Sequence, residues 1–386
     1  MKSRYRLVAS LLVAGALAAG CGKQESGTAA GETVVRIGSV APLTGPQAHL
    51  GRDNDNGARL AMDDINAAGL TLGGKKARIE LISEDDQADP RIATIVAQKF
   101  VDNGVAGVIG HLNSGATIPA SKIYHDAGIP QISPSATAIA YTAQGFETAF
   151  RVMTNDEQQG KVLGQFAVNT LGAQRIAIID DRTAYGQGLA DEFEKSARAA
   201  GAQIVTREFT SDRSTDFMAI LTSIKGKDPQ LVFYGGMDAQ GGPIARQMKE
   251  LGLGARLLGA DGMQTAEFLK LAGAAADGVV ASSPGMSLSS MPEGQTFKQK
   301  FNARYGEIQN YAPYAYDAVQ VMVAAMRRAD STDPRIYLPE IARTDLQGVT
   351  GHIRFDAKGD IAGGYVTLYQ VKNDAWQVLE TIESGK

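Results

Sequence analysis

Short apolar runs alternate along the chain with segments in which apolar residues recur every three or four positions. In the first half, the runs that are typical of strands buried on both faces of a parallel sheet lie at 34–41, 77–83, 105–109 and 128–133. The segments with helical spacing between them lie at 58–65, 92–100 and 119–126. This βα repeat predicts a parallel sheet with helices on both faces.

The same alternation begins again after residue 150. Further strands are predicted at 174–180, 202–209, 229–236, 255–261 and 278–283. A linker-like stretch at 284–292 precedes helices at 296–305 and 313–329, and strand-like runs follow at 352–356, 365–371 and 376–382. The fold class is therefore predicted to be α/β with two doubly wound parallel-sheet lobes. Periodicity does not assign the last elements to either lobe.

The amino end has the pattern of an export signal. Basic residues precede an apolar run at 7–17, which falls short of the roughly 20 residues that span a bilayer. Small residues then lead to Cys21, in a segment that resembles the bacterial lipobox, although Ala18 stands where Leu is usual. We expect a signal peptide at 1–20, lipidation of Cys21 and a flexible tether at 21–33. The alternative is a soluble periplasmic protein cut after an A-x-A-like site.

Composition narrows the function further. The 386 residues are 44% hydrophobic and 21% charged, with a formal net charge of −4, which is typical of a soluble globular protein with room for two domains. The chain lacks basic blocks, so it offers nucleic acid no electrostatic footprint. Cys21 is the only cysteine, so no intrachain disulfide is expected.

Motifs of several enzyme and cofactor-binding classes are absent. The chain has no G-x-S-x-G, no G-x-x-x-x-G-K-[ST], no H-E-x-x-H and no C-x-x-C. Gly186 and Gly188 begin a G-x-G, but Asp191 occupies the place of the third glycine of a dinucleotide fingerprint. The four histidines have no metal-ligand spacing, and the acidic run at 84–86 is more typical of a solvated turn than of a cation site. No cofactor, no metal and no catalysis are expected.

A polar loop predicted at 111–117 lies between a strand that ends at Gly110 and a helix that begins near Pro119. Free backbone N–H groups and the positive end of a helix dipole at that place could hold a carboxylate or a phosphate without a cationic side chain. Ser114 would add a hydroxyl. The alternative is an ordinary turn in which Ser114 is the N-cap.

Other ligand candidates follow the apolar runs, because ligands of open α/β sheets bind beyond the carboxyl ends of the strands. These candidates are Ser135, Ala136, Thr137, Tyr185, Met237 and Asp261. The first half of the chain thus supplies hydroxyls and the second half an acid. A small zwitterion suits this arrangement, with its carboxylate at the hydroxyls and its ammonium at Asp261.

Several runs together carry a resemblance to a family. They are GSVAPLTGPQAHLG at 38–51, IGHLNSGATIPAS at 109–121, PSATA at 134–138, YGQGLA at 185–190 and YGGM at 234–237. With them the chain resembles the leucine/isoleucine/valine-binding proteins of ABC importers over nearly its whole length after the tether. The resemblance implies a type I periplasmic-binding fold, in which two lobes joined by a three-strand hinge close on an amino acid. It assigns 34–152 and 285–355 to the first lobe, and 153–284 and 356–386 to the second.

The resemblance also implies roles for residues. Ser114 and Thr137 would bind the ligand carboxylate, together with backbone groups at Leu112 and Ser135. Tyr185 and Asp261 would face the ligand from the other lobe, with Asp261 taking the ammonium where the family often has Glu.

This sequence departs from the family's pattern at four further places. Leu50 stands where an aromatic residue is frequent, and Met237 where a tyrosine is frequent. Both changes fall on the pocket for the ligand's side chain, which Leu50, Met237, Tyr185 and Tyr311 would line. Two cysteines that can pair in the family are Ala88 and Asn113 here.

The expected function is that of a periplasmic solute-binding protein of an ABC importer, with no catalysis. It would capture branched-chain aliphatic amino acids and deliver them to permease subunits, as a monomer anchored to a membrane by lipid on Cys21. One alternative is the same fold binding an amide, urea or an aromatic acid, although the two hydroxyls and the acid argue against neutral ligands. A second is a ligand sensor for a receptor or regulator, and an enzyme ranks third.

Overall fold

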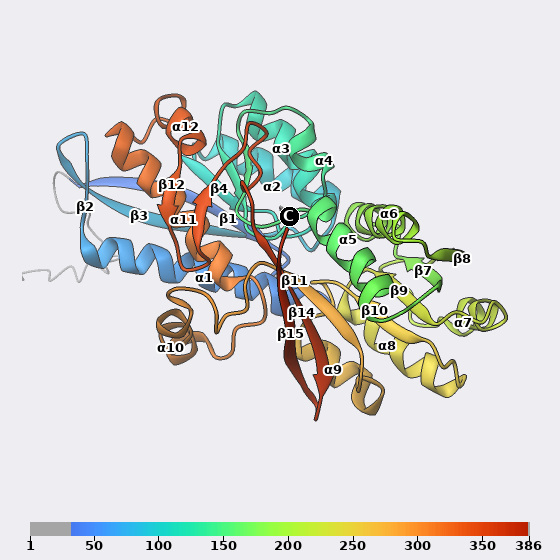
Figure 1. Ribbon diagram of the computed structural model, residues 1–386. Helices are drawn as coiled ribbons and strands as arrows, with labels where there is room; N and C mark the ends of the chain where they lie inside the picture. Colours follow the sequence, from blue (N-terminus) through green and yellow to red (C-terminus); the bar gives the residue numbers. More distant parts are fainter. Residues whose placement is uncertain (1–31, 385–386) are drawn as a thin grey trace, which may run out of the picture.

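The computed structural model describes residues 32–384 (Figure 1). The expected signal peptide, the Cys21 lipid site and almost all of the expected tether lie outside these residues. Within residues 32–384, the chain forms two large sheets and one small two-stranded sheet.

The first large sheet has six strands in the order β2-β3-β1-β4-β5-β6. Its strands are β1 (Thr33–Ala41), β2 (Leu70–Leu72), β3 (Lys75–Asp85), β4 (Gly107–Gly110), β5 (Gln131–Ser133) and β6 (Ala149–Arg151). All neighbours pair in parallel except β2 and β3, which form an antiparallel edge. Every residue of β4, β5 and β6 is buried, as expected for strands covered on both faces.

Helices cover both faces of this sheet (Figure 1). They are α1 (Ala48–Ala68), α2 (Pro90–Asp102), α3 (Ser114–Asp126), α4 (Ala140–Ala143), α10 (Gly294–Tyr305), α11 (Ala312–Ala329) and α12 (Pro334–Ala342). On one face, α1 and α11 pack together over Ile37 and Ile79. On the other, α2 and α3 enclose Val40, Phe100 and Tyr124. We call this sheet with these helices lobe 1.

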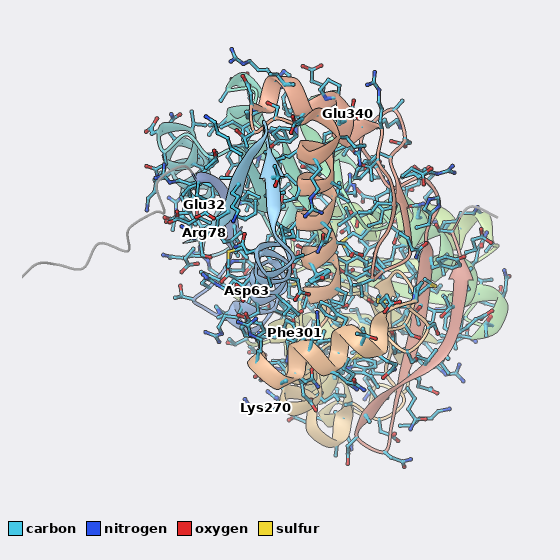
Figure 2. The ribbon with its side chains drawn as sticks, turned by 90° about the vertical axis from the view of Figure 1, so that its left-hand side faces the viewer. Glu32, Asp63, Arg78, Lys270, Phe301 and Glu340 are labelled. Atoms are coloured by element: carbon cyan, nitrogen blue, oxygen red, sulfur yellow. The ribbon has the colours of Figure 1, made fainter. Side chains whose placement is uncertain are left out.

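Helix α10 joins lobe 1 through its contact with α1 (Figure 2). Its Phe301 is buried, whereas Arg304 and Lys300 form ion pairs with Asp63 (2.7 Å) and Asp64 (2.8 Å) of α1. A late segment of the chain is thereby fixed to an early helix.

The second large sheet has seven strands in the order β15-β14-β11-β10-β9-β7-β8. Its strands are β7 (Arg175–Asp180), β8 (Gln203–Phe209), β9 (Leu231–Gly235), β10 (Arg256–Gly259), β11 (Val280–Pro284), β14 (Tyr365–Lys372) and β15 (Ala375–Glu383). Its helical segments are α5 (Asp156–Gln165) with the π-helical turn η1 (Phe166–Thr170), α6 (Ala184–Ala199), α7 (Met218–Lys225), α8 (Asp238–Glu250), α9 (Ala266–Ala272) and η2 (Gly273–Ala275). The sheet is parallel from β8 to β11, and β14 and β15 extend it antiparallel. We call this unit lobe 2.

The chain passes between the lobes three times. These crossing segments run from β6 to α5, from β11 to α10, and from β13 (His352–Arg354) to β14. The strand predicted at 352–356 is shorter in the structure, where β13 ends at Arg354 and pairs with β12 (Asp345–Gln347) in the small sheet. The predicted α/β class with two parallel-sheet lobes is confirmed.

The prediction of the loop at 111–117 is wrong in length. Helix α3 begins at Ser114, five residues before the predicted start, and Asn113 in extended backbone is its N-cap. Pro119 lies inside the helix and removes one of its hydrogen bonds. The first turns are nevertheless held because Ala116 and Ala120 pack into the core, so tertiary packing overrides the local signal.

Candidate functional site

The predicted ligand residues all lie in the interior, although they come from both lobes. None is more than 6% exposed, and they are Leu50, Leu112, Ser114, Ser135, Ala136, Thr137, Tyr185, Met237, Asp261 and Tyr311. Five of the six apolar or aromatic ones belong to a single core cluster that continues from lobe 1 into lobe 2; they are Leu50, Leu112, Tyr185, Met237 and Tyr311. The structure therefore shows the two lobes in contact around these residues.

Asp261, just beyond β10 in lobe 2, is the polar centre of the contact. Its Oδ1 accepts hydrogen bonds from the Tyr185 hydroxyl (2.8 Å) and from Gln159 Nε2 (2.8 Å), and its Oδ2 accepts one from the Tyr311 hydroxyl (2.7 Å). Tyr311 belongs to lobe 1, so the carboxylate is reached from both lobes. Burial raises the pKa of Asp261, and the two tyrosine donors oppose that rise.

Tyr311 is placed by a buried acid that sequence reasoning missed. The Asp53 carboxylate of α1 accepts hydrogen bonds from four backbone N–H groups at the start of α11. They belong to Gln309 (3.0 Å), Asn310 (3.0 Å), Tyr311 (2.7 Å) and Ala312 (2.9 Å). A carboxylate there satisfies orphan donors and complements the helix dipole. Asp53 lies on the core-facing side of α1. This position could have identified it from the sequence, because a buried carboxylate needs hydrogen-bond donors.

The hydroxyl residues of lobe 1 are brought together by the loop after β5, residues 134–138, which we call the β5 loop. Ser114, the first residue of α3, accepts a hydrogen bond from the Ala138 N–H (3.1 Å). Ser135 accepts one from Asn54 Nδ2 (2.9 Å). The hydroxyl of Thr137 is buried and has no hydrogen-bond partner among the described residues. The loop therefore lies beside the amino end of α3, where an anion is favoured.

Arg151, another residue that the sequence did not single out, supports the β5 loop from behind. It is fully buried and donates to the carbonyls of Ala136 (2.8 Å) and Ala138 (3.0 Å). Its charge is balanced by Asp360 of the third crossing segment. The loop is thus fixed where the chain passes between the lobes.

Two residues of the side-chain end of the predicted pocket meet within lobe 2. Met237 and Tyr185 both approach Gly262: a β-carbon there would lie 2.7 Å from the Met237 sulfur and 3.2 Å from a Tyr185 ring carbon. Any residue larger than glycine at 262 would therefore disturb Met237.

His49 and Asp238 form an ion pair across the lobes, and each is the sequence neighbour of a predicted pocket residue. His49 Nε2 lies 2.8 Å from Asp238 Oδ2, which also accepts from the Thr265 hydroxyl (2.6 Å). Burial lowers the pKa of His49, but the hydrogen bond and charge of Asp238 outweigh it, so the pKa is raised. We call this contact the His49–Asp238 bridge.

The acidic run at 84–86 serves internal contacts. Glu84 pairs with Lys99 (2.6 Å), and Asp86 Oδ2 lies 2.7 Å from His111 Nδ1 in the core.

Over residues 32–384, no group of three or more His, Cys, Asp or Glu side chains is arranged to hold a metal ion. None of the helices described there has the length and apolarity needed to cross a membrane.

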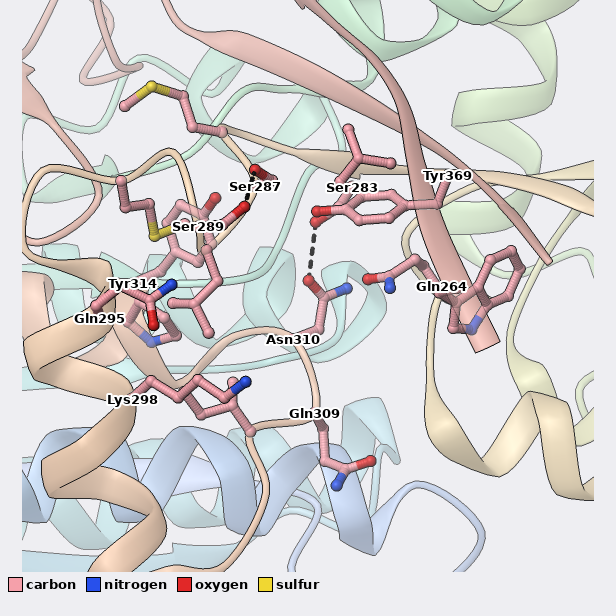
Figure 3. Close-up of a pocket in the computed structure, with 17 residues that line it drawn as sticks. Gln264, Ser283, Ser287, Ser289, Gln295, Lys298, Gln309, Asn310, Tyr314 and Tyr369 are labelled. Atoms are coloured by element: carbon pink, nitrogen blue, oxygen red, sulfur yellow. Dashed lines mark hydrogen bonds between the residues drawn. The ribbon is translucent and has the colours of Figure 1, made fainter. Parts of the chain in front are cut away.

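A cavity of about 400 Å³ lies next to the candidate site but does not include it (Figure 3). Its wall includes Tyr314, Tyr369 and Trp376, and none of the ten predicted residues. It adjoins the site through Asn310, which donates to the backbone carbonyl of Asp261 (3.2 Å) and accepts from Ser283 (2.8 Å). We place the candidate site at the buried carboxylate and hydroxyls, because binding needs polar groups that converge on one point.

Comparisons with known proteins agree with this architecture. The model of a family described as periplasmic binding protein matches residues 34–375. The Leu/Ile/Val-binding protein homolog 1 of Brucella suis is 37% identical over 331 residues, which cover 84% of this chain and 87% of that protein. The leucine-, isoleucine-, valine-, threonine-, and alanine-binding protein of Pseudomonas aeruginosa is 33% identical over 342 residues, 88% of this chain and 91% of that one.

A solved structure with the same architecture is the branched-chain amino acid transporter substrate binding protein LivJ from Streptococcus pneumoniae, in complex with isoleucine. It superposes with a TM-score of 0.83 at 29% identity and covers 91% of this chain and 100% of that one. The resemblance inferred from the sequence motifs is confirmed. This chain belongs to the periplasmic binding protein family.

Proposed function

We propose that this protein is the solute-binding component of an ABC importer and that it captures branched-chain aliphatic amino acids between its lobes. One observation carries the proposal: Asp261 of lobe 2 is bonded from both lobes, and both it and the hydroxyl residues of lobe 1 are buried. An acid opposite hydroxyls and a helix amino end matches the two charges of an amino acid.

The apolar side of the contact supports an aliphatic ligand. Leu50, Met237 and Tyr185 are buried in one cluster, and methionine adapts its shape to what it packs against. The relatives in Brucella suis and Pseudomonas aeruginosa bear leucine, isoleucine and valine in their names, and the pneumococcal structure holds isoleucine. A neutral amide or urea, or an aromatic acid without an ammonium, would leave Asp261 without a cationic partner.

The ligand roles follow from the position of each residue. Ser114 and Thr137, with backbone groups at Leu112, Ser135 and Ala136, would bind the carboxylate. Asp261 would bind the ammonium, and Tyr185 and Tyr311 would orient Asp261.

We also propose a cellular role for the protein. The protein acts in the periplasm as a monomer, delivers its ligand to permease subunits, and is held at a membrane by lipid on Cys21. It performs no catalysis.

A competition experiment tests the ligand class. Unlabelled amino acids compete with labelled leucine for the pure protein, and we expect leucine, isoleucine and valine to compete within roughly 100-fold of one another, since one methylene separates ligands by about 1–3 kcal/mol. Glutamate and lysine should not compete, because burying an unpaired charge costs far more. The keto acid of leucine, which lacks the ammonium, is the matched control and should fail. Tight binding of glutamate or lysine without leucine would overturn the ligand class and leave the fold intact.

A further inference from the structure

Asp156 is a buried acid in the contact between the lobes that the proposed function does not use. It is the first residue of α5, directly after the first crossing segment, and its backbone N–H donates to the Thr137 carbonyl (2.9 Å). Asn155 and Gln158 form a capping box around it, in which each side chain bonds the other's backbone N–H. The position of Asp156 relative to the β5 loop is therefore fixed.

The carboxyl group of Asp156 lacks what the other buried acids of the site have. It is 0% exposed, and neither oxygen has a hydrogen-bond partner among the described residues. Asp261 by contrast receives three side-chain donors, and Asp53 receives four backbone N–H groups. A buried carboxylate without donors is strongly disfavoured, so this group favours the protonated form.

The net effect of the surroundings is to raise the pKa of Asp156 to about 8. Burial is the largest cause and the charges of Asp261 and Glu192 add to it, whereas the Thr137 hydroxyl and the charge of Arg151 oppose the rise. The Thr137 hydroxyl lies close enough to the carboxyl to lower this pKa as a hydrogen-bond donor, although the pair does not reach the geometry of a regular hydrogen bond.

Two unpartnered polar groups thus lie side by side, the Asp156 carboxyl and the Thr137 hydroxyl. Helix α6 of lobe 2 packs closely against the Asp156 carboxyl, since a β-carbon at Gly188 would lie 3.2 Å from Asp156 Oδ2. Because Thr137 is a proposed ligand residue, the direction in which its hydroxyl proton points matters for binding.

We propose that Asp156 is a positioning residue that works as a neutral acid: its O–H donates to Thr137 Oγ1, which turns the Thr137 proton toward the ligand carboxylate. This inference rests on the proposed function. An ionised Asp156 would instead accept the Thr137 proton and would place a second negative charge beside Asp261. The neutral acid thus leaves Asp261 as the only anion facing one ammonium.

The test measures leucine affinity by titration calorimetry from pH 6 to pH 9 for the wild type and Asp156→Asn. An Asn side chain donates a hydrogen bond as the neutral acid does, but it does not titrate. We expect the variant to bind leucine within about 3-fold of the wild type at pH 6. The wild type should weaken by about 10-fold relative to the variant by pH 9, since a pKa of about 8 leaves roughly a tenth of the acid protonated there. The ratio between the two proteins cancels the titration of leucine itself and of His49.

Glu157→Gln is the matched control, because it removes an acid from the next position of α5, where the residue is exposed. Its pH profile should follow the wild type. A constant affinity ratio between the wild type and Asp156→Asn across the pH range would overturn the role of Asp156 while leaving amino-acid binding intact. Loss of leucine binding in Asp156→Asn at pH 6, with the fold retained, would show that an ionised carboxylate is needed and would also overturn it. Failure of the wild type to bind any amino acid at any pH would overturn the proposed function itself.

Discussion

Replacing Asp261 by asparagine removes the charge proposed to bind the ligand ammonium and keeps the size of the side chain. In the structure the carboxylate already accepts from Tyr185, Tyr311 and Gln159, so the ligand ammonium would be its only cationic donor. The amide introduced by Asp261→Asn would offer one acceptor oxygen in place of two and would turn an N–H donor toward hydroxyl donors. A charge-assisted hydrogen bond contributes about 1.5–3 kcal/mol, which corresponds to a loss of leucine affinity of roughly 10-fold to 100-fold.

Titration calorimetry with leucine measures this loss, and thermal unfolding shows whether the variant is folded. Asp277→Asn is the control, because it makes the same change at an exposed position of lobe 2. The preference for leucine over its keto acid should shrink in Asp261→Asn, since the charge that recognises the ammonium is gone. Leucine affinity within about 3-fold of the wild type, in a folded variant, would refute the reasoning and place the ammonium elsewhere.

Two further predictions concern closure of the lobes. The His49–Asp238 bridge joins α1 of lobe 1 to α8 of lobe 2. Because the pKa of His49 is raised, the stabilisation of the closed lobes by this bridge is complete below the ordinary pKa of 6.5 and is lost as pH rises through the raised pKa. His49→Gln should therefore weaken leucine binding about 5-fold at pH 6 and less at pH 8, with exposed His352→Gln as control; equal ratios at both values would contradict this. Small-angle scattering should show a smaller radius of gyration with leucine than without it, and no change at saturation would count against closure unless the free protein is already closed.

The repeat of strands and helices could be predicted from the sequence because it depends on local periodicity. Strands such as β4 and β9 are buried on both faces, so each is a continuous apolar run. The start of α3 could not be predicted in the same way. Pro119 is a strong local signal for a helix start, and the packing of Ala116 and Ala120 into the core explains why the helix begins earlier.

The candidate site could be predicted where it follows a simple geometric rule. Asp261 and Thr137 lie just beyond strands, and the carboxyl ends of parallel strands meet at one edge. Gln159 and Asp156 follow no such rule. Both lie on α5 among polar residues that resemble an exposed helix face, and they become interior only because the chain has just crossed between the lobes there.

The unsatisfied groups of this interior have a consequence for the coupling of binding to closure. Ser114, Ser135 and Arg151 form hydrogen bonds that hold the β5 loop, whereas the Thr137 hydroxyl, with the neutral Asp156 donating to it, has no acceptor for its own proton among the described residues. Each unsatisfied group costs about 1–3 kcal/mol when it is buried. Closing the lobes without a ligand therefore carries a penalty that closing on a carboxylate would remove. A difference of about 1–3 kcal/mol shifts an equilibrium between open and closed lobes by roughly one to two orders of magnitude, so the Thr137 proton, which has no acceptor until a carboxylate is present, would make closure depend on the ligand.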